Sequence, residues 1–145
     1  MTSRLTRRAL GGLCLALAVS ASCSSSPTGP GGLNVSGTWV GTWQFLTSGV
    51  TVTDNVTVSF VQTAGTATGT WTADSGATGS MQFQVAGSVS GTVTISQATL
   101  SGLTCIGTGQ LSGTVSTTAI SVTTPGFTTN GSCQWATNDQ FSLHR

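Results

Sequence analysis

The sequence predicts an all-β domain, an antiparallel up-and-down β-barrel of about eight strands, and three observations support this prediction. From Val35 onward, apolar and polar residues alternate with the period of a strand that has one buried face. The polar positions are rich in Thr, whose branched side chain packs well on a pleated sheet. Turn formers such as Ser48-Gly49 and Asn130-Gly131 separate the runs, so neighbouring strands should pair as antiparallel hairpins.

The alternating runs predict about eight strands, with their apolar residues on the inner face. In chain order, the runs cover residues 35–45, 50–60, 66–73, 81–85, 88–96, 103–115, 120–122, 133–135 and 141–143. Glycines at inner positions, among them Gly41, Gly69 and Gly91, would let the strands bend and coil. A β-sandwich is the alternative, but its Greek-key crossings need longer connections than this chain offers.

The domain is nearly uncharged, which excludes several classes of function. Only 5% of the whole chain is charged, and after the N-terminal segment the one basic residue is Arg145. Without a basic patch, we expect no nucleic-acid partner. His144 is the only histidine, so a catalytic base is poorly supplied and we expect no enzyme. Scattered acids and no histidine cluster also predict no metal site and no cofactor.

The N-terminus divides the chain into three parts. Residues 1–22 are a predicted signal peptide, with Arg4, Arg7 and Arg8 before an uncharged run from Ala9 to Val19. Residues 23–33 are rich in Gly, Ser and Pro and predict a flexible tether. Residues 34–145 form the predicted barrel domain.

The stretch Val19-Ser20-Ala21-Ser22-Cys23 resembles the lipobox of bacterial lipoproteins. This resemblance implies acylation of Cys23 and a protein exported to the cell envelope, lipid-anchored to a bacterial membrane on its periplasmic or surface side. Cleavage after Ala21, giving a freely secreted chain, is the alternative. The cysteine count favours the anchor, because Cys14 leaves with the signal and Cys105 can pair with Cys133 as a disulfide. Cys23 is then the only cysteine without a partner in this scheme, and acylation would account for its thiol.

The first strands resemble those of lipocalin-like and avidin-like barrels. The resemblance is carried by Gly37-Thr38-Trp39, Gly41-Thr42-Trp43 and Thr68-Gly69-Thr70-Trp71. It implies an eight-stranded barrel with a ligand cup at one end. The avidin-like biotin site does not carry over, since the chain has no Tyr. Arg145 is the candidate for the basic residue that closes lipocalin barrels.

Four tryptophans, Trp39, Trp43, Trp71 and Trp135, fall on predicted inner faces. The first three could line a barrel mouth, with Asp54 also in phase with the inner face of its strand. Alternatively, they fill the barrel as core. For the remaining acids, Asp74 and Asp139, we expect solvated positions at turns.

Two functions follow from these predictions. The first is an envelope lipoprotein that binds a small apolar ligand in a barrel mouth lined by Trp39, Trp43 and Trp71. The second is a structural or protein-interaction domain with a filled barrel and no ligand. A third, weaker hypothesis is an inhibitor that presents the Thr124–Asn130 loop to an enzyme. The sequence indicates no particular oligomeric state.

Overall fold

The structure is a computed structural model that describes residues 32–47, 49–100, 102–130 and 138–145. The predicted signal peptide, Cys23 and nearly all of the tether lie outside these residues. The described part contains strands and no helix. The strands are β1 (Gly37–Thr47), β2 (Val50–Thr63), β3 (Thr66–Ala73), β4 (Thr78–Ala86), β5 (Ser88–Leu100), β6 (Leu103–Val115), β7 (Ala119–Thr124), β8 (Phe127–Thr129) and β9 (Asp139–His144).

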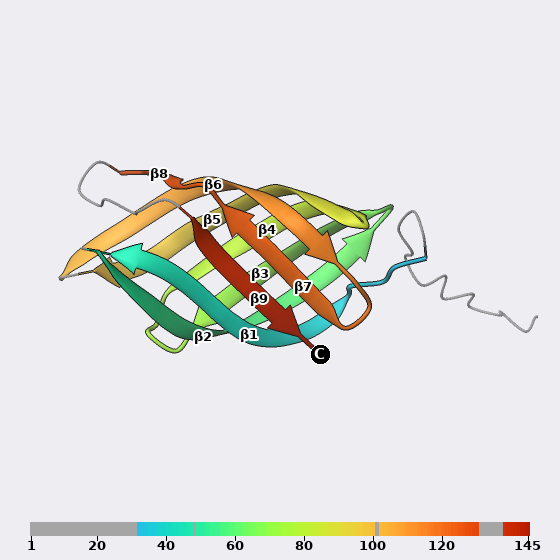
Figure 1. The fold of residues 1–145 in the computed structure, drawn as a ribbon, viewed down its shortest axis with the longest axis horizontal. Helices are drawn as coiled ribbons and strands as arrows, with labels where there is room; N and C mark the ends of the chain where they lie inside the picture. Colours follow the sequence, from blue (N-terminus) through green and yellow to red (C-terminus); the bar gives the residue numbers. More distant parts are fainter. Residues whose placement is uncertain (1–31, 48, 101, 131–137) are drawn as a thin grey trace, which may run out of the picture.

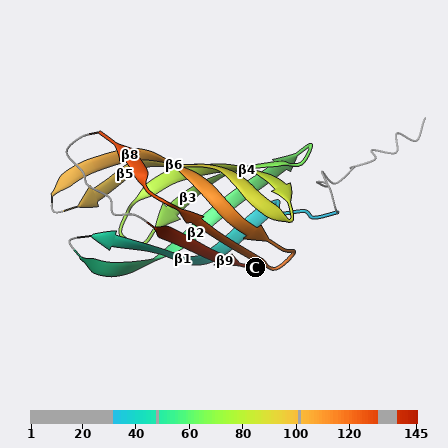
Figure 2. The ribbon, with the colours of Figure 1, turned by 45° about the horizontal axis from the view of Figure 1, so that its top comes forward.

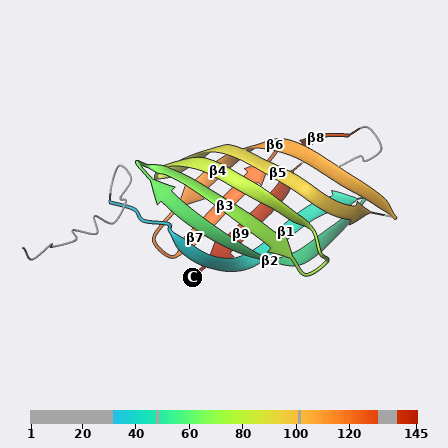
Figure 3. The same cartoon turned by 180° about the vertical axis from the view of Figure 1, so that it is seen from behind.

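The strands form a closed antiparallel barrel (Figure 1). Consecutive strands from β1 to β7 are hydrogen-bonded neighbours, and β9 lies between β7 and β1 and closes the ring. The predicted eight-stranded up-and-down barrel is therefore confirmed, and the sandwich is excluded. Figure 3 shows the far wall, where β2, β3, β4 and β5 run side by side.

The additional strand is β8, which extends the edge of β6 beside β7 (Figure 2). The second half of β6 pairs with β7, whereas Gly107–Gly109 pair with β8. Pro125 cannot donate a backbone hydrogen bond, and it separates the two short strands. The prediction of a plain loop from Thr124 to Asn130 was therefore wrong, because its centre is a paired strand. The predicted strand at 133–135 lies outside the described residues.

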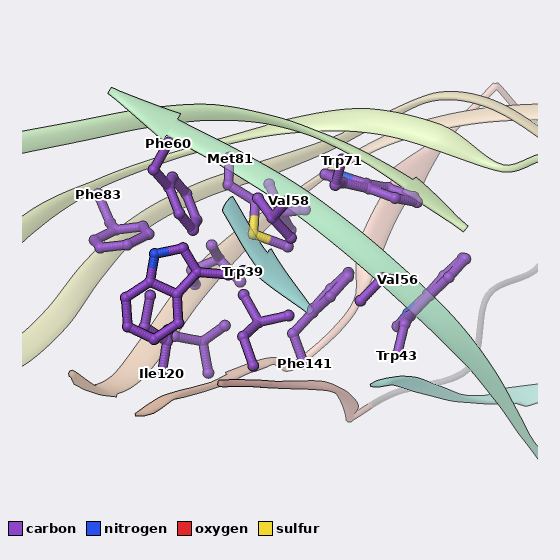
Figure 4. Packing of buried hydrophobic residues seen from close by; sticks show 14 of the residues in the cluster. Trp39, Trp43, Val56, Val58, Phe60, Trp71, Met81, Phe83, Ile120 and Phe141 are labelled. Atoms are coloured by element: carbon purple, nitrogen blue, oxygen red, sulfur yellow. The ribbon is translucent and has the colours of Figure 1, made fainter. Parts of the chain in front are cut away.

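The barrel interior is filled by the inner-face residues that the alternation predicted (Figure 4). The prediction fails where the strands project beyond the ring. Val50 is 62% exposed and Leu103 is 51% exposed, because no opposite wall covers the tips of the β1–β2 and β5–β6 hairpins. Inner-face alternation therefore indicates burial only in the middle of the barrel.

One end of the barrel, which we call the sealed end, is closed by the segment before β1. The side chain of Gln62 accepts a hydrogen bond from the Val35 amide (2.8 Å) and donates one to the Leu33 carbonyl (3.0 Å). The indole N–H of Trp39 donates to the Val35 carbonyl (2.8 Å), and the Arg145 guanidinium lies 4.5 Å from the centre of the Trp39 ring. Arg145 therefore covers the first tryptophan at this end of the barrel.

Candidate ligand-binding site

The opposite end, which we call the distal end, holds a cluster of aromatic rings. Trp43 on β1 stacks in parallel on Phe141 of β9, with ring centres 5.7 Å apart. Trp71 on β3 meets both rings edge-on, at 5.3 Å from Trp43 and 5.7 Å from Phe141. Phe45 adds a tilted contact of 4.4 Å to Trp43. These four residues are the distal cluster, and Figure 4 shows three of them well separated from Trp39.

The three tryptophans expected in one mouth thus lie in different parts of the barrel. Trp39 packs at the sealed end with Phe60, Phe83 and Ile120 around it (Figure 4). Trp43 and Trp71 belong to the distal cluster, and each of the three is at most 1% exposed. Trp135 lies outside the described residues. The arrangement therefore leaves the distal end as the place where two of the predicted site residues meet.

Asp139 is the unexpected member of this end. It is 0% exposed, so the prediction of a solvated turn position was wrong. Burial raises the pKa of Asp139 to about 7, and hydrogen bonding from the Trp43 side chain opposes the rise. The Trp43 contact falls short of a well-formed hydrogen bond, and neither carboxylate oxygen has such a bond from the described residues. A buried carboxylate without a hydrogen bond lowers the stability of the folded state, so its presence here needs a physical explanation.

The inward direction of Asp139 follows from the register of β9. Asp139, Phe141 and Leu143 alternate on one face of the strand, and all three are buried. Asp139 is also paired with the buried Thr124 on β7. The alternation that identified Phe141 and Leu143 extends back to Asp139, and this signal could have located the residue from sequence.

The other two acids serve the β3–β4 turn. Asp54 pairs with Trp43 across the β1–β2 ladder, is partly buried, and accepts a hydrogen bond from the Ser75 amide at 3.3 Å. Asp74 is exposed, as predicted, and accepts a hydrogen bond from the Asn55 amide group at 2.9 Å. Asp54 therefore lies at the distal end, but its carboxylate anchors a turn and does not stand unpaired.

Five hollows of about 270–460 Å³ on the described residues have no part of Trp39, Trp43 or Trp71 in their walls. One of them, a hollow of about 320 Å³ that we call the rim hollow, lies at the end of the β1–β9 seam. Its walls are Gln44, Phe45, Leu46, Thr51, Asn138 and Gln140. Phe45 belongs to the distal cluster, and Asn138 and Gln140 flank Asp139. Of the distal cluster, only Phe45 therefore lines the rim hollow, and Asp139 itself does not.

Side chains that could ligate a metal do not cluster in the part of the chain that the structure describes. The described residues contain no group of three or more histidine, cysteine or acidic side chains that could hold an ion. His144 is exposed on β9, at the sealed end, far along the strand from Asp139. The distal end thus brings aromatic rings and one carboxylate together.

The cysteines predicted to carry chemistry are described only in part. Cys105 on β6 is fully buried. Cys23 and Cys133 lie outside the described residues, so the lipid anchor and the disulfide stay predictions.

Within the part of the chain that the structure describes, no helix has the length and apolar character needed to cross a membrane.

The fold and this site define an eight-stranded antiparallel barrel with one sealed end and an aromatic, acid-containing distal end. No protein-family model matches the chain, and a search of curated proteins finds no significant relative. Function therefore has to be argued from the site alone.

Proposed function

We propose that the protein is an exported, lipid-anchored binding protein that takes a small, largely apolar ligand at the distal end of its barrel. The observation that carries the proposal is Asp139, a fully buried carboxylate without a well-formed hydrogen bond beside the distal cluster. A polar group buried among rings at this cost fits a role in fixing a ligand better than a role in stability. The resemblance of the first strands to lipocalin-like barrels, which hold ligands at one end, agrees with this proposal.

Tryptophan fluorescence tests the proposal directly, because Trp43 and Trp71 lie in the distal cluster while Trp39 lies at the sealed end. We expect saturable quenching by at least one member of a panel of small ring-containing compounds. The variant Trp39→Phe should keep the response, and Trp43→Phe should reduce it severalfold. If no compound gives a saturable change, the protein is not a small-molecule binder of this kind.

The anchor is the second part of the proposal. Acylation of Cys23 would tie the barrel to a membrane through the Ser- and Gly-rich tether, and buried acyl chains contribute about 0.8 kcal/mol per CH₂ group. Mass spectrometry of the mature N-terminus should find a lipid-modified Cys23. The variant Cys23→Ser should move the protein from the membrane fraction to the soluble fraction. An unmodified Cys23 in the wild-type protein would contradict the anchor.

We also propose a disulfide between Cys105 and Cys133, which suits an oxidising compartment. The bond would tie β6 to the segment between β8 and β9. In the loop-entropy model it restricts the unfolded chain by about 3–4 kcal/mol. Intact-mass measurement before and after reduction and alkylation should detect it, and two free thiols in the exported protein would contradict it.

A filled barrel that acts as an interaction domain is the second candidate function. It is favoured by the packing of the tryptophans against other rings, and by hollows that open on Thr, Ser and Gln of the outer face. In this case no compound should quench the fluorescence, and a photocrosslinker at the exposed Thr68 should give a discrete adduct in cells. A crosslinker at the exposed His144 is the matched control.

A further inference from the structure

We propose that the distal end of strand β9 opens in response to pH, and that loss of the Asp139 proton favours the open form. The segment concerned is Asp139–Phe141, which we call the distal seam because it lies between β7 and β1 where the barrel closes. The inference goes beyond the proposed function, since the opening needs no ligand. It is carried by the position of the acid in β9, by its burial and by the charges of the domain.

Asp139 lies where β9 has the fewest strand partners. It is the first residue of β9, and among the described residues its partner is Thr124 at the end of β7. The ladder between β9 and β1 begins one residue later, with the pair of Gln140 and Gln44. Asn138, directly before the strand, is exposed and has a left-handed backbone with a φ of 76°. The acid is therefore at a strand end, where local opening requires the least free energy.

The closed seam keeps the Asp139 carboxyl group away from water. The side chain is 0% exposed, and neither oxygen has a well-formed hydrogen bond within the described residues. The hydroxyl of its strand partner Thr124 donates instead to the Gly126 carbonyl at 3.1 Å. A neutral carboxyl group tolerates such an environment far better than a carboxylate does. Outward movement of the end of β9 would give the charged form the water that the closed seam withholds.

The domain does not supply Asp139 with a counter-charge. Neither β1 nor β7, the strands that flank β9, carries a titratable side chain. From residue 32 onward, the other titratable side chains are Asp54, Asp74, Cys105, Cys133, His144 and Arg145. The aspartates and cysteines in this set are neutral or negative, so they cannot offset a carboxylate. Arg145 covers Trp39 at the sealed end, and His144 is its neighbour. Ionised Asp139 is therefore stabilised chiefly by reaching water.

The direction of the pH effect follows from the difference between the two forms. In the closed seam, burial raises the pKa of Asp139 to about 7, and in the open form water returns it towards the usual 3.8. Between these pH values opening releases a proton, so the ratio of open to closed molecules should rise about tenfold per pH unit, or about a thousandfold in total. Above about pH 7 the closed form is ionised as well, and the ratio should level off.

Opening of the seam would uncover part of the distal cluster. Phe141, the third residue of β9, stacks on Trp43 with ring centres 5.7 Å apart. Movement of Asp139 and Gln140 away from β7 and β1 removes cover from this pair of rings. In the closed structure none of the five hollows reaches Trp43 or Trp71, so opening gives the proposed ligand a route to them. This last step alone rests on the proposed function.

Hydrogen exchange of the mature protein in detergent tests the opening without a ligand. We expect protection of the Gln140 and Phe141 amides, corrected for the intrinsic effect of pH on exchange, to fall about tenfold per pH unit between pH 5 and pH 7. Amides of Thr70 and Trp71 should stay more strongly protected, because β3 is paired on both sides along most of its length. Equal protection of the two sets at every pH would mean that only the whole barrel unfolds, which would overturn the inference.

Three variants connect the opening to one residue. Asp139→Asn removes the proton that controls it and should make the protection of Gln140 independent of pH. Asp139→Leu repeats the test with an apolar side chain, in case the buried amide prevents folding. Asp74→Asn removes an exposed acid from the same end and should retain the tenfold change. A wild-type protection that does not vary with pH, or an unchanged slope in the Asp139 variants, would show the inference to be wrong. If the seam opens but no compound of the panel binds, the proposed function is wrong and the opening stands.

Discussion

At the scale of single residues, the buried carboxyl group of Asp139 makes the stability of the folded protein depend on pH. Its pKa of about 7 means that the folded state holds a proton that the unfolded chain, with the usual value of 3.8, has already released between these two pH values. The folded state therefore binds more protons in this window, and stability must fall as the pH rises through it. Each pKa unit corresponds to about 1.4 kcal/mol, so the total loss by pH 8 is up to about 4 kcal/mol.

The variant Asp139→Asn removes this titration while keeping the shape of the side chain. The wild-type melting temperature should decrease between pH 5 and pH 8, and that of the variant should stay nearly constant, so that the variant is the more stable protein at pH 8. Thermal unfolding followed by circular dichroism across this range measures the difference. Asp74→Asn is the control and should retain the wild-type decrease. Parallel pH profiles of wild type and Asp139→Asn would contradict the assigned titration.

At the scale of elements, the segment before β1 behaves as a plug that Gln62 holds in place. Gln62 is 0% exposed, and its side chain hydrogen-bonds the amide of Val35 and the carbonyl of Leu33. The backbone N–H of Gln62 donates to the Ser36 hydroxyl at 3.0 Å. A buried glutamine in a β-strand is unusual, and here it replaces the strand partner that the plug lacks.

Replacing Gln62 by Leu should detach this plug. The substitution preserves volume but leaves the Val35 amide and the Leu33 carbonyl without their partner, at a cost of about 1–3 kcal/mol for each buried group. Urea unfolding should show the loss of stability, and hydrogen exchange at the Val35 amide should accelerate. Gln82→Leu, at an exposed position of β4, is the matched control. Unchanged exchange at Val35 would show that other contacts hold the plug.

A second feature of the strands is their close approach to one another at inward-facing glycines. A Cβ atom on Gly91 would lie 2.0 Å from the Gln82 carbonyl oxygen and 2.6 Å from the Phe83 Cα, both parts of the adjacent strand β4. Backbone cannot move away as a flexible side chain can. The predicted role of inner glycines in bending the strands is consistent with this tight contact.

Gly91→Ala should therefore push β5 away from β4 and destabilise the barrel by about 1–3 kcal/mol, the usual cost of overpacking. Ser90→Ala, at the adjacent exposed position, should change stability by less than about 0.5 kcal/mol. Chemical denaturation of both variants gives the comparison. Equal stability of the two would mean that the strands separate locally without penalty.

At the scale of the whole molecule, Trp71 links parts of the barrel that are distant in sequence. Its ring contacts Trp43 of β1 and Phe141 of β9, and its indole N–H donates to the Thr94 carbonyl of β5 at 3.2 Å. These contacts join opposite walls of the barrel through one side chain. The interior is therefore a single packed unit, which small domains need in order to unfold cooperatively.

Truncation of Trp71 should therefore lower the free energy of unfolding of the whole barrel. We expect Trp71→Ala to cost about 3–5 kcal/mol, as for other large aromatic residues in cores. Urea unfolding monitored by far-ultraviolet circular dichroism measures the change, and Thr70→Ala, exposed on the same strand, is the control. A loss below about 1 kcal/mol would indicate that the distal end is loosely packed and contributes little to the core.

The sequence alone was sufficient for the fold class and for most of the inner face. Alternation and short turns predict up-and-down pairing, because a strand with one apolar face and a short connection can pair only with its neighbour. Residues such as Val58, Phe83 and Val93 were placed correctly for this reason. The strand tips, β8 and the burial of Asp139 were not predicted, since each depends on what lies opposite in space.

The division between sequence and tertiary structure is clearest in the tryptophans. The sequence by itself determined that Trp39, Trp43 and Trp71 face inward, because the period of two is a local property of each strand. Only the tertiary structure decided that Trp39 lies under Arg145 at one end, while Trp43 and Trp71 meet beside Asp139 at the other. Position along the barrel depends on register and on closure by β9, and these are fixed by contacts between residues far apart in the chain.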